Sequence, residues 1–457
     1  MSAELSAEPN LEVGAKGAET AGRVPLLRLI AYAALELPVM GAMNLMTLFL
    51  GFRYSELGVS LGSVAVIVMV ARLLDVLIDP AVGFLSDRTR SRFGRRKVWI
   101  FAGTPVYLLA VWRLFIPPEQ VDAVYFATWM VVFWLGFSMI NIPYYAWGAE
   151  LSPDYRERTR VTTWRTVAGS AGFWLGVTVP TLVYGTDPKA GDALRIVAMY
   201  TALLLPVAVI AVGFLVPDRG TGTAAVPILR GLGVMLRNGP FLRLLAAFTI
   251  VGLGPVLQGV MYPFFVKHIV GSGGSGISNL IAYIPFVMGG VVIWGLLATR
   301  IEKHQAWMCG MTFMVFATSL YMLVGEGDKT LMLCVLMTSG IGSGALTALP
   351  ASMKADVVDL DAIESGEDRA GLFFAAWSLA VKLIAALGQF LAFGSLALVG
   401  FQTDGVNPPE KLLGLRIFYS AGPGLLYLIG LLLVWNYPIT SIRHAQLRAQ
   451  LAERGAR

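Results

Sequence analysis

Twelve long apolar stretches constrain this chain more than any other feature of its sequence. A helix that crosses a lipid bilayer needs about 20 mostly apolar residues. The charged fraction is 14%, against about a quarter in soluble domains. We therefore expect an all-α integral membrane protein and exclude a soluble enzyme, a disordered chain and a nucleic-acid binder. The predicted spans are 25–52, 60–85, 98–117, 121–149, 161–185, 193–216, 240–268, 277–299, 305–325, 329–354, 370–400 and 412–436.

Lysine and arginine are distributed unevenly between the polar segments that separate these stretches. Segments predicted for one side include the basic runs at 88–97 and 156–165, whereas the alternate segments hold few basic residues. Because basic loops stay in the cytoplasm, we expect a multi-pass protein of the cell inner (plasma) membrane with both termini cytoplasmic. On this prediction 1–24 and 437–457 are cytoplasmic tails, and 217–239 is a cytoplasmic linker.

The linker divides the chain into an N-terminal half, 25–216, and a C-terminal half, 240–436, with six predicted helices each. The halves show a weak internal repeat at their fourth helices. Two parallel six-helix repeats are typical of the major facilitator fold, in which the substrate site lies between the halves. Each fourth helix has a proline near its end and an acidic exit: Pro143 and Glu150, Pro350 and Asp356.

Five ionisable residues fall inside the predicted helices: Glu36, Arg72, Asp75, Asp79 and Lys382. A charge at the bilayer centre costs about 2.5–3.5 kcal/mol even on an insertion scale, so such residues usually face a cavity or pair with one another. At about 100° per residue, the three on the second helix share one face.

Asp75 and Asp79 are close enough to repel each other, which favours a site for Na⁺ or H⁺ between them. The alternative is a structural Arg72–Asp75 ion pair, with Asp79 as a cap or gate partner. Lys382 is the lone charge within the helices of its half, and the two carboxylates are its expected partners across the central cavity. The alternative for Lys382 is a snorkelling side chain.

A second group of residues could contact a substrate. Glu36 could bind a substrate hydroxyl, or it could be a polar group at a kink beside Pro38. Aromatic side chains, among them Tyr145 and Trp377, could stack on a sugar ring, although packing and interface anchoring are commoner roles. Several of these aromatic residues cluster in the sequence near Asn141 and Arg165.

The loop after the second helix is a candidate gate. It anchors the chain as a positive-inside loop, but its acidic residue and Gly-Arg-Arg motif could also clamp neighbouring helix ends by charge-assisted hydrogen bonds. Such a clamp could break and re-form as the halves rock. The candidate gating residues are Gly83, Asp87, Arg88, Gly94, Arg95 and Arg96.

Other chemistry has no support in the sequence. Cys309 and Cys334 fall in predicted helices, where free cysteines are usually buried and inert. There is no metal-ligand spacing and no phosphate-binding loop. We therefore expect no catalytic residues, no metal and no cofactor apart from a coupling ion.

Four stretches together resemble the glycoside–pentoside–hexuronide:cation symporter family of the major facilitator superfamily, the melibiose-permease relatives. The resemblance covers all twelve helices. The stretches are Ala71-Arg72-Leu73-Leu74-Asp75 to Asp79-Pro80, Asp87 to Arg96, Asn141-Ile142-Pro143-Tyr144 with Arg156-Glu157-Arg158, and Ala355-Asp356 running to Gly371-Leu372-Phe373-Phe374 and Lys382.

The resemblance implies a role for each matching residue. Asp75 and Asp79 match the cation carboxylates and Lys382 the helix-11 lysine of the family. Glu36 and Arg165, the latter offset by one position, match residues near the sugar. Tyr145 stands where the melibiose branch packs an aromatic ring on the sugar.

Two departures from the melibiose branch affect the expected ion. Asn141 replaces a third acid and Ile78 replaces a polar residue, although Ser138 keeps a hydroxyl group. Fewer oxygen ligands favour H⁺ over Na⁺.

The expected protein is a monomeric secondary active transporter in the lipid bilayer, with a sugar-like substrate, a coupling cation and no nucleic-acid partner. An uncoupled facilitator and a lipid or apolar-metabolite transporter of the same fold remain alternatives.

Overall fold

The structure is a computed structural model that describes residues 24–152, 154–185, 187–218, 238–365 and 370–438. Within these ranges, twelve helices are long and apolar enough to cross a membrane. The predicted all-α membrane fold is confirmed. The proposed tails at 1–24 and 437–457, and the linker at 217–239, lie almost entirely outside the described residues.

The first span of the N-terminal half is broken into short pieces, and the others are single helices. The pieces meet at Leu35 and at a π-helical segment, Met46–Leu50. The helices of this half are α2 (Leu26–Ala34), α3 (Glu36–Leu45), α4 (Gly51–Glu56), α5 (Leu61–Arg88), α6 (Arg95–Phe115), α7 (Ala123–Glu150), α8 (Tyr155–Tyr184) and α9 (Ala190–Leu215).

The C-terminal half repeats this six-span arrangement. One helix is longer than expected: the span predicted to end at 354 continues to Ser365, because apolarity marks only the part of a helix that lies in the bilayer. The helices are α11 (Gly239–His268), α12 (Asn279–Leu297), α13 (Lys303–Ser319) with a 3₁₀ turn (Leu320–Leu323), α14 (Lys329–Ser365), α15 (Ala370–Leu398) and α16 (Pro409–Val434).

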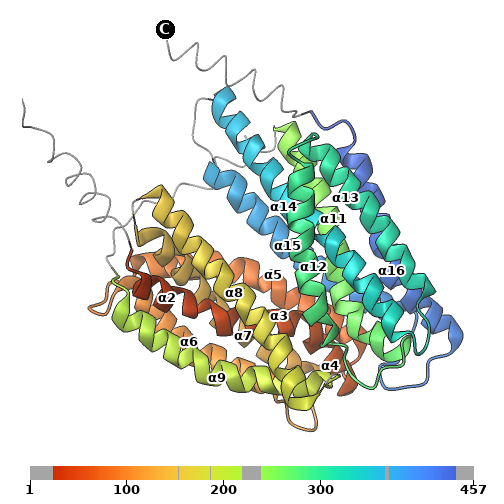
Figure 1. The fold of residues 1–457 in the computed structure, drawn as a ribbon. Coiled ribbons are helices and arrows are strands. Elements are labelled where there is room, and N and C mark those ends of the chain that lie inside the picture. The colour runs from red at the N-terminus through yellow and green to blue at the C-terminus, as the bar shows by residue number, and fades with distance from the viewer. Residues whose placement is uncertain (1–23, 153, 186, 219–237, 366–369, 439–457) are drawn as a thin grey trace, which may run out of the picture.

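The two halves form separate bundles that meet at one end and diverge toward the other (Figure 1). They meet near α4, where the rings of Phe52 and Phe264 pack edge to face at 4.8 Å. In the same region Lys267 of α11 lies 2.8 Å from the Glu56 carboxylate. The diverging ends are the start of α2 in one half and the end of α14 in the other.

A glycine-rich loop fastens the end where the halves meet. Asp187, between α8 and α9, accepts hydrogen bonds from the backbone nitrogens of Gly274 and Gly276 at 3.2 and 2.9 Å, and one from the Ser272 hydroxyl. A Cβ on Gly274 would lie 2.2 Å from the Asp187 carbonyl oxygen. Only glycine therefore allows the loop to close on this carboxylate.

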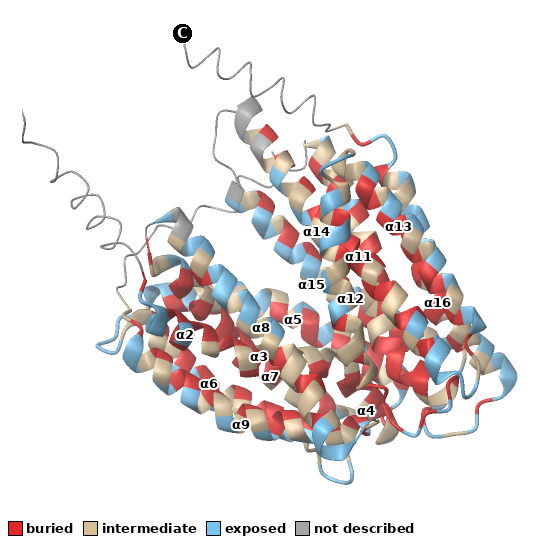
Figure 2. Cartoon of the chain, in the orientation of Figure 1, coloured by how far each residue is buried: buried red, intermediate tan, exposed pale blue. Residues whose placement is uncertain are grey.

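Buried residues fill the interior of each bundle and the junction near α4, while exposed residues cover outer faces and also lie along α8 and α15 (Figure 2). Cys309 and Cys334 are exposed, so the prediction that they are buried was wrong. Both cysteines lie within helices that are long and apolar enough to span a membrane. A small apolar side chain suits that position as well as it suits a core.

Close helix packing in the N-terminal half fixes the position of Glu36. A Cβ on Gly172 of α8 would lie 2.0 Å from the carbonyl oxygen of Leu37 in α3. Small residues permit such approach between membrane helices. On the other side, the hydroxyls of Tyr32 and Tyr144 each donate to the other residue's carbonyl oxygen at 2.9 Å. Glu36 is thereby held between α7 and α8.

Candidate functional site

A charge cluster joins the two halves between α5, α7 and α15. Lys382 of α15 lies 2.8 Å from Oδ2 of Asp75 and also forms an ion pair with Asp79. The Ser138 hydroxyl of α7 lies 3.0 Å from Oδ1 of Asp75 and 2.6 Å from Oδ1 of Asp79. The Asp75 side chain is 2% exposed, against 20% for Asp79 and 24% for Lys382. The structure thus brings together the three charges, although Asp75 and Lys382 are 307 residues apart in the sequence.

Arg72 lies on the same helix but has a different partner. Its guanidinium carbon is 3.8 Å from the centroid of the Trp134 ring. The Arg72–Asp75 ion pair that their spacing permits is not formed within the described part of the chain, and the buried Nε has no hydrogen-bond partner there. Arg72 therefore adds positive charge near the carboxylates, but unlike Lys382 it forms no ion pair with them in the described part of the chain.

A second polar group lies in the N-terminal half, between α3, α7 and α8. The Tyr145 hydroxyl donates a 3.0 Å hydrogen bond to Oε1 of Glu36. The guanidinium carbon of Arg165 lies 4.0 Å from the centroid of the Tyr145 ring. Asn141 is one turn before Tyr145, and its buried Oδ1 has no hydrogen-bond partner among the described residues. These groups offer a carboxylate, a guanidinium that donates hydrogen bonds and an unused acceptor oxygen to a hydroxylated ligand.

The candidate gating loop forms a clamp between α5, α6 and α7. Arg96 binds Asp87 at 2.6 Å and Glu150 at 2.8 Å, and Arg95 binds the same Glu150 oxygen at 2.7 Å. Asp218, after α9, accepts a 2.8 Å hydrogen bond from the backbone nitrogen of Arg96. The clamp fastens helix ends within the N-terminal half.

The remaining gating candidates contribute differently to this loop. Gly94 has φ 103°, and a Cβ there would lie 2.3 Å from the Asp218 carboxylate. Gly83 packs near Ile142. Arg88 lies over the ring of Phe84 and takes no part in the clamp.

Trp377 lies apart from the Glu36 group in the sequence and in its contacts. Its ring stacks on Phe248 at 4.0 Å, and the Lys354 ammonium lies 5.0 Å from its centroid. The ring is therefore part of the packed core of the C-terminal half.

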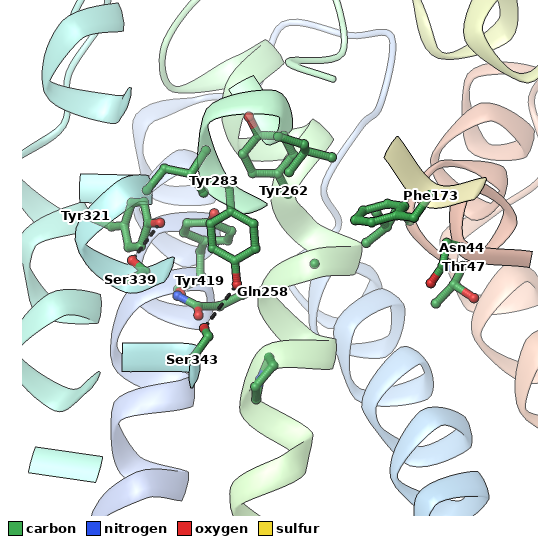
Figure 3. A pocket seen from close by; sticks show the side chains of 15 residues that line it. Asn44, Thr47, Phe173, Gln258, Tyr262, Tyr283, Tyr321, Ser339, Ser343 and Tyr419 are labelled. Atoms are coloured by element: carbon green, nitrogen blue, oxygen red, sulfur yellow. Dashed lines mark hydrogen bonds between the residues drawn. The ribbon is translucent and has the colours of Figure 1, made fainter. Parts of the chain in front are cut away.

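A cavity between the halves was missed by reasoning from the sequence. Its volume is about 220 Å³. Figure 3 shows tyrosine and serine side chains on one side of it, with Phe173, Asn44 and Thr47 of the N-terminal half on the other. Its tyrosines come one from each of several segments, so no local motif marks the site: Tyr262, Tyr283, Tyr321 and Tyr419.

The fold and the charged groups between two six-helix halves define a transporter of the major facilitator class. Residues 31–441 match the model of the MFS/sugar transport protein family, and the chain belongs to this family. The chain is 26% identical to an uncharacterized symporter of Synechocystis over 93% of this chain and 96% of that protein.

Two further relatives carry different substrate names. A protein of Escherichia coli named as a glycoside/cation symporter is 24% identical, over 90% of this chain and 91% of its own. The human sodium-dependent lysophosphatidylcholine symporter 1 is also 24% identical, over 88% of this chain and 80% of its own.

Solved structures agree on the fold. A bacterial homologue of the human lysosomal transporter Spinster, in an inward-facing conformation, superposes with a TM-score of 0.70, at 12% identity, over 92% of this chain and 99% of that one. The nucleoside transporter NupG superposes with a TM-score of 0.66, at 12% identity, over 88% of this chain and 99% of its own.

Proposed function

We propose that this protein is a proton-coupled symporter of a glycoside or similar sugar-like molecule that works by alternating access. The observation that carries the proposal is the contact of Lys382, in the C-terminal half, with Asp75 and Asp79, in the N-terminal half. An ion pair that joins the two halves within the membrane links the charge of the carboxylates to the relative position of the halves.

The coupling follows from competition for the carboxylates. A proton on either aspartate removes one charge that holds Lys382, so it weakens the attraction between α5 and α15. If the substrate prefers the same arrangement of the halves as the proton does, each ligand raises the affinity for the other. The two factors must be equal. On the orientation expected from the basic loops, the end at which the two bundles diverge (Figure 1) lies on the cytoplasmic side.

The proposed substrate site is the group of Glu36, Asn141, Tyr145 and Arg165. Glu36 and the Oδ1 of Asn141, which has no partner among the described residues, accept hydrogen bonds, and Arg165 donates them. Alternating donors and acceptors beside the Tyr145 ring suit the hydroxyls and the apolar face of a sugar. The name of the Escherichia coli relative supports this substrate class.

Protons are favoured over Na⁺ because an ammonium already lies between the two carboxylates. A metal ion at that position would have to displace Lys382, whereas a proton needs only one carboxylate oxygen. Sodium coupling is the second candidate. It is favoured by the buried Asn141 oxygen, one turn along α7 from Ser138, since hard cations take several oxygen ligands, and by the sodium-dependent relatives.

The test is uptake of a panel of radiolabelled sugars and glycosides into proteoliposomes. We expect accumulation above the external concentration when the outside is acidic, and none under a Na⁺ gradient at equal pH. Accumulation under the Na⁺ gradient alone would show that Na⁺, and not H⁺, is the coupling ion. Uptake that stops at equal concentrations under both gradients would show an uncoupled facilitator.

A further inference from the structure

The cavity between the halves lies beyond the polar substrate group, along the same two helices. Asn44 follows Glu36 by eight residues on α3, and Phe173 follows Arg165 by eight on α8. At about 1.5 Å per residue, both steps are about 12 Å along the helix axis. Residues at this spacing lie on one side of a helix, so the cavity continues the substrate group toward the end where the halves meet.

The polar atoms of the cavity wall are largely paired with one another. The hydroxyls of Tyr283 and Ser343 are 3.0 Å apart, as are those of Tyr321 and Ser339 (Figure 3). The Tyr262 hydroxyl donates to the Gly276 carbonyl oxygen at 2.8 Å. A wall whose hydroxyls are already satisfied presents ring faces and carbon atoms to a ligand, and none of the cavity-lining residues is charged.

The volume limits what the cavity can hold. About 150 Å³ of apolar cavity suffices for benzene, so the 220 Å³ here accommodates one ring or a short alkyl group. The adjoining segment Met46–Leu50 is π-helical, a distortion that often occurs at functional sites. It places Thr47 and Leu48 in the cavity wall.

We infer that the cavity is a subsite for the aglycone of an amphiphilic glycoside. This inference rests on the proposed function: the sugar lies at Glu36, Tyr145 and Arg165, and a short spacer carries the aryl group of the aglycone about 12 Å further along α3 and α8. Aromatic rings on the wall favour an aromatic aglycone, which they contact in edge-to-face or offset-stacked arrangements.

The test compares two glycosides of each sugar, β-D-glucose and β-D-galactose, as ligands of the purified full-length protein, by thermal stabilisation over a concentration series. One is the methyl glycoside. The other is the 4-phenylbutyl glycoside, called the phenyl glycoside below, whose spacer lets the ring lie about 12 Å from the sugar. The probe variant is Gly259→Val. Gly259 lines the cavity, and among the described residues a Cβ there meets only Leu48, at 3.0 Å. The matched control is Gly295→Val on α12, where a Cβ meets no atom within 4 Å. Unliganded melting of both variants reports on folding.

We expect the wild type and Gly295→Val to bind the phenyl glycoside about tenfold more tightly than the methyl glycoside of the same sugar. Gly259→Val should lose this preference and keep its affinity for the methyl glycoside. Methyl-glycoside binding without a phenyl preference, or a preference that survives in Gly259→Val, would overturn the subsite alone. Binding of lysophosphatidylcholine but of neither glycoside would overturn the proposed function as well.

Discussion

Replacing Asp75 with Asn is expected to abolish accumulation of substrate against its gradient. Asp75 is 2% exposed and contacts both Lys382 and Ser138. Asparagine keeps the shape of the side chain but neither holds the ammonium by charge nor carries the coupled proton. Coupling free energies are typically 1–3 kcal/mol, so the gain in substrate affinity that protonation gives the wild type, about 5–150-fold, should be lost.

Two measurements are made in proteoliposomes. The first is uptake under a pH gradient, and the second is exchange of labelled for unlabelled substrate at equal pH. We expect Asp75→Asn to equilibrate substrate and to retain exchange, since the Glu36 group is unchanged. The matched control is Glu119→Gln at an exposed loop position, which should behave as the wild type. Accumulation by Asp75→Asn equal to that of the wild type would show that Asp75 takes no part in coupling.

Replacing Lys382 with Gln is expected to destabilise the protein and to abolish coupling. The change leaves the carboxylates of Asp75 and Asp79 facing each other without the ammonium that lies between them. Removing one partner of a fully buried ion pair costs about 3–5 kcal/mol, and the partial exposure of Asp79 and Lys382 should reduce this to about 2 kcal/mol. The apparent melting temperature in detergent measures the loss.

A second substitution separates charge balance from loss of packing. Asp79→Asn in the Lys382→Gln background removes the repulsion between the two carboxylates, so part of the lost stability should return while coupled uptake stays absent. Lys329→Gln, at an exposed position where α14 begins, is the control and should melt as the wild type does. If the double variant is less stable than Lys382→Gln alone, the Lys382–aspartate contact is not what holds α15 to α5.

The charges inside the membrane were the most informative part of the sequence. Burial of an unpaired ammonium is so unfavourable that the partners of Lys382 could be named from the other half of the chain. The shared face of Asp75 and Asp79 followed from helical spacing. The same spacing also permitted an Arg72–Asp75 pair, but in the structure Arg72 packs on Trp134 and Asp75 pairs with Lys382.

Other parts of the structure could not be derived from the sequence, for physical reasons. Trp377 was selected by residue type, but an aromatic ring fits a packed core as readily as a sugar, and Phe248 is its partner. The part of α14 after residue 354 lies beyond the apolar span, so hydropathy does not reveal that the helix continues to Ser365. The cavity takes residues from several helices of both halves, so it exists only once those helices are packed.

Proton movement during substrate entry tests the central claim most directly. Proteoliposomes with a pH-sensitive dye inside, and no initial pH difference, are given an inward gradient of a transported glycoside in Na⁺-free buffer. Proton-coupled symport predicts that the interior acidifies as substrate enters, and that Asp75→Asn abolishes the acidification. Substrate entry with no change of internal pH in the wild type would contradict it.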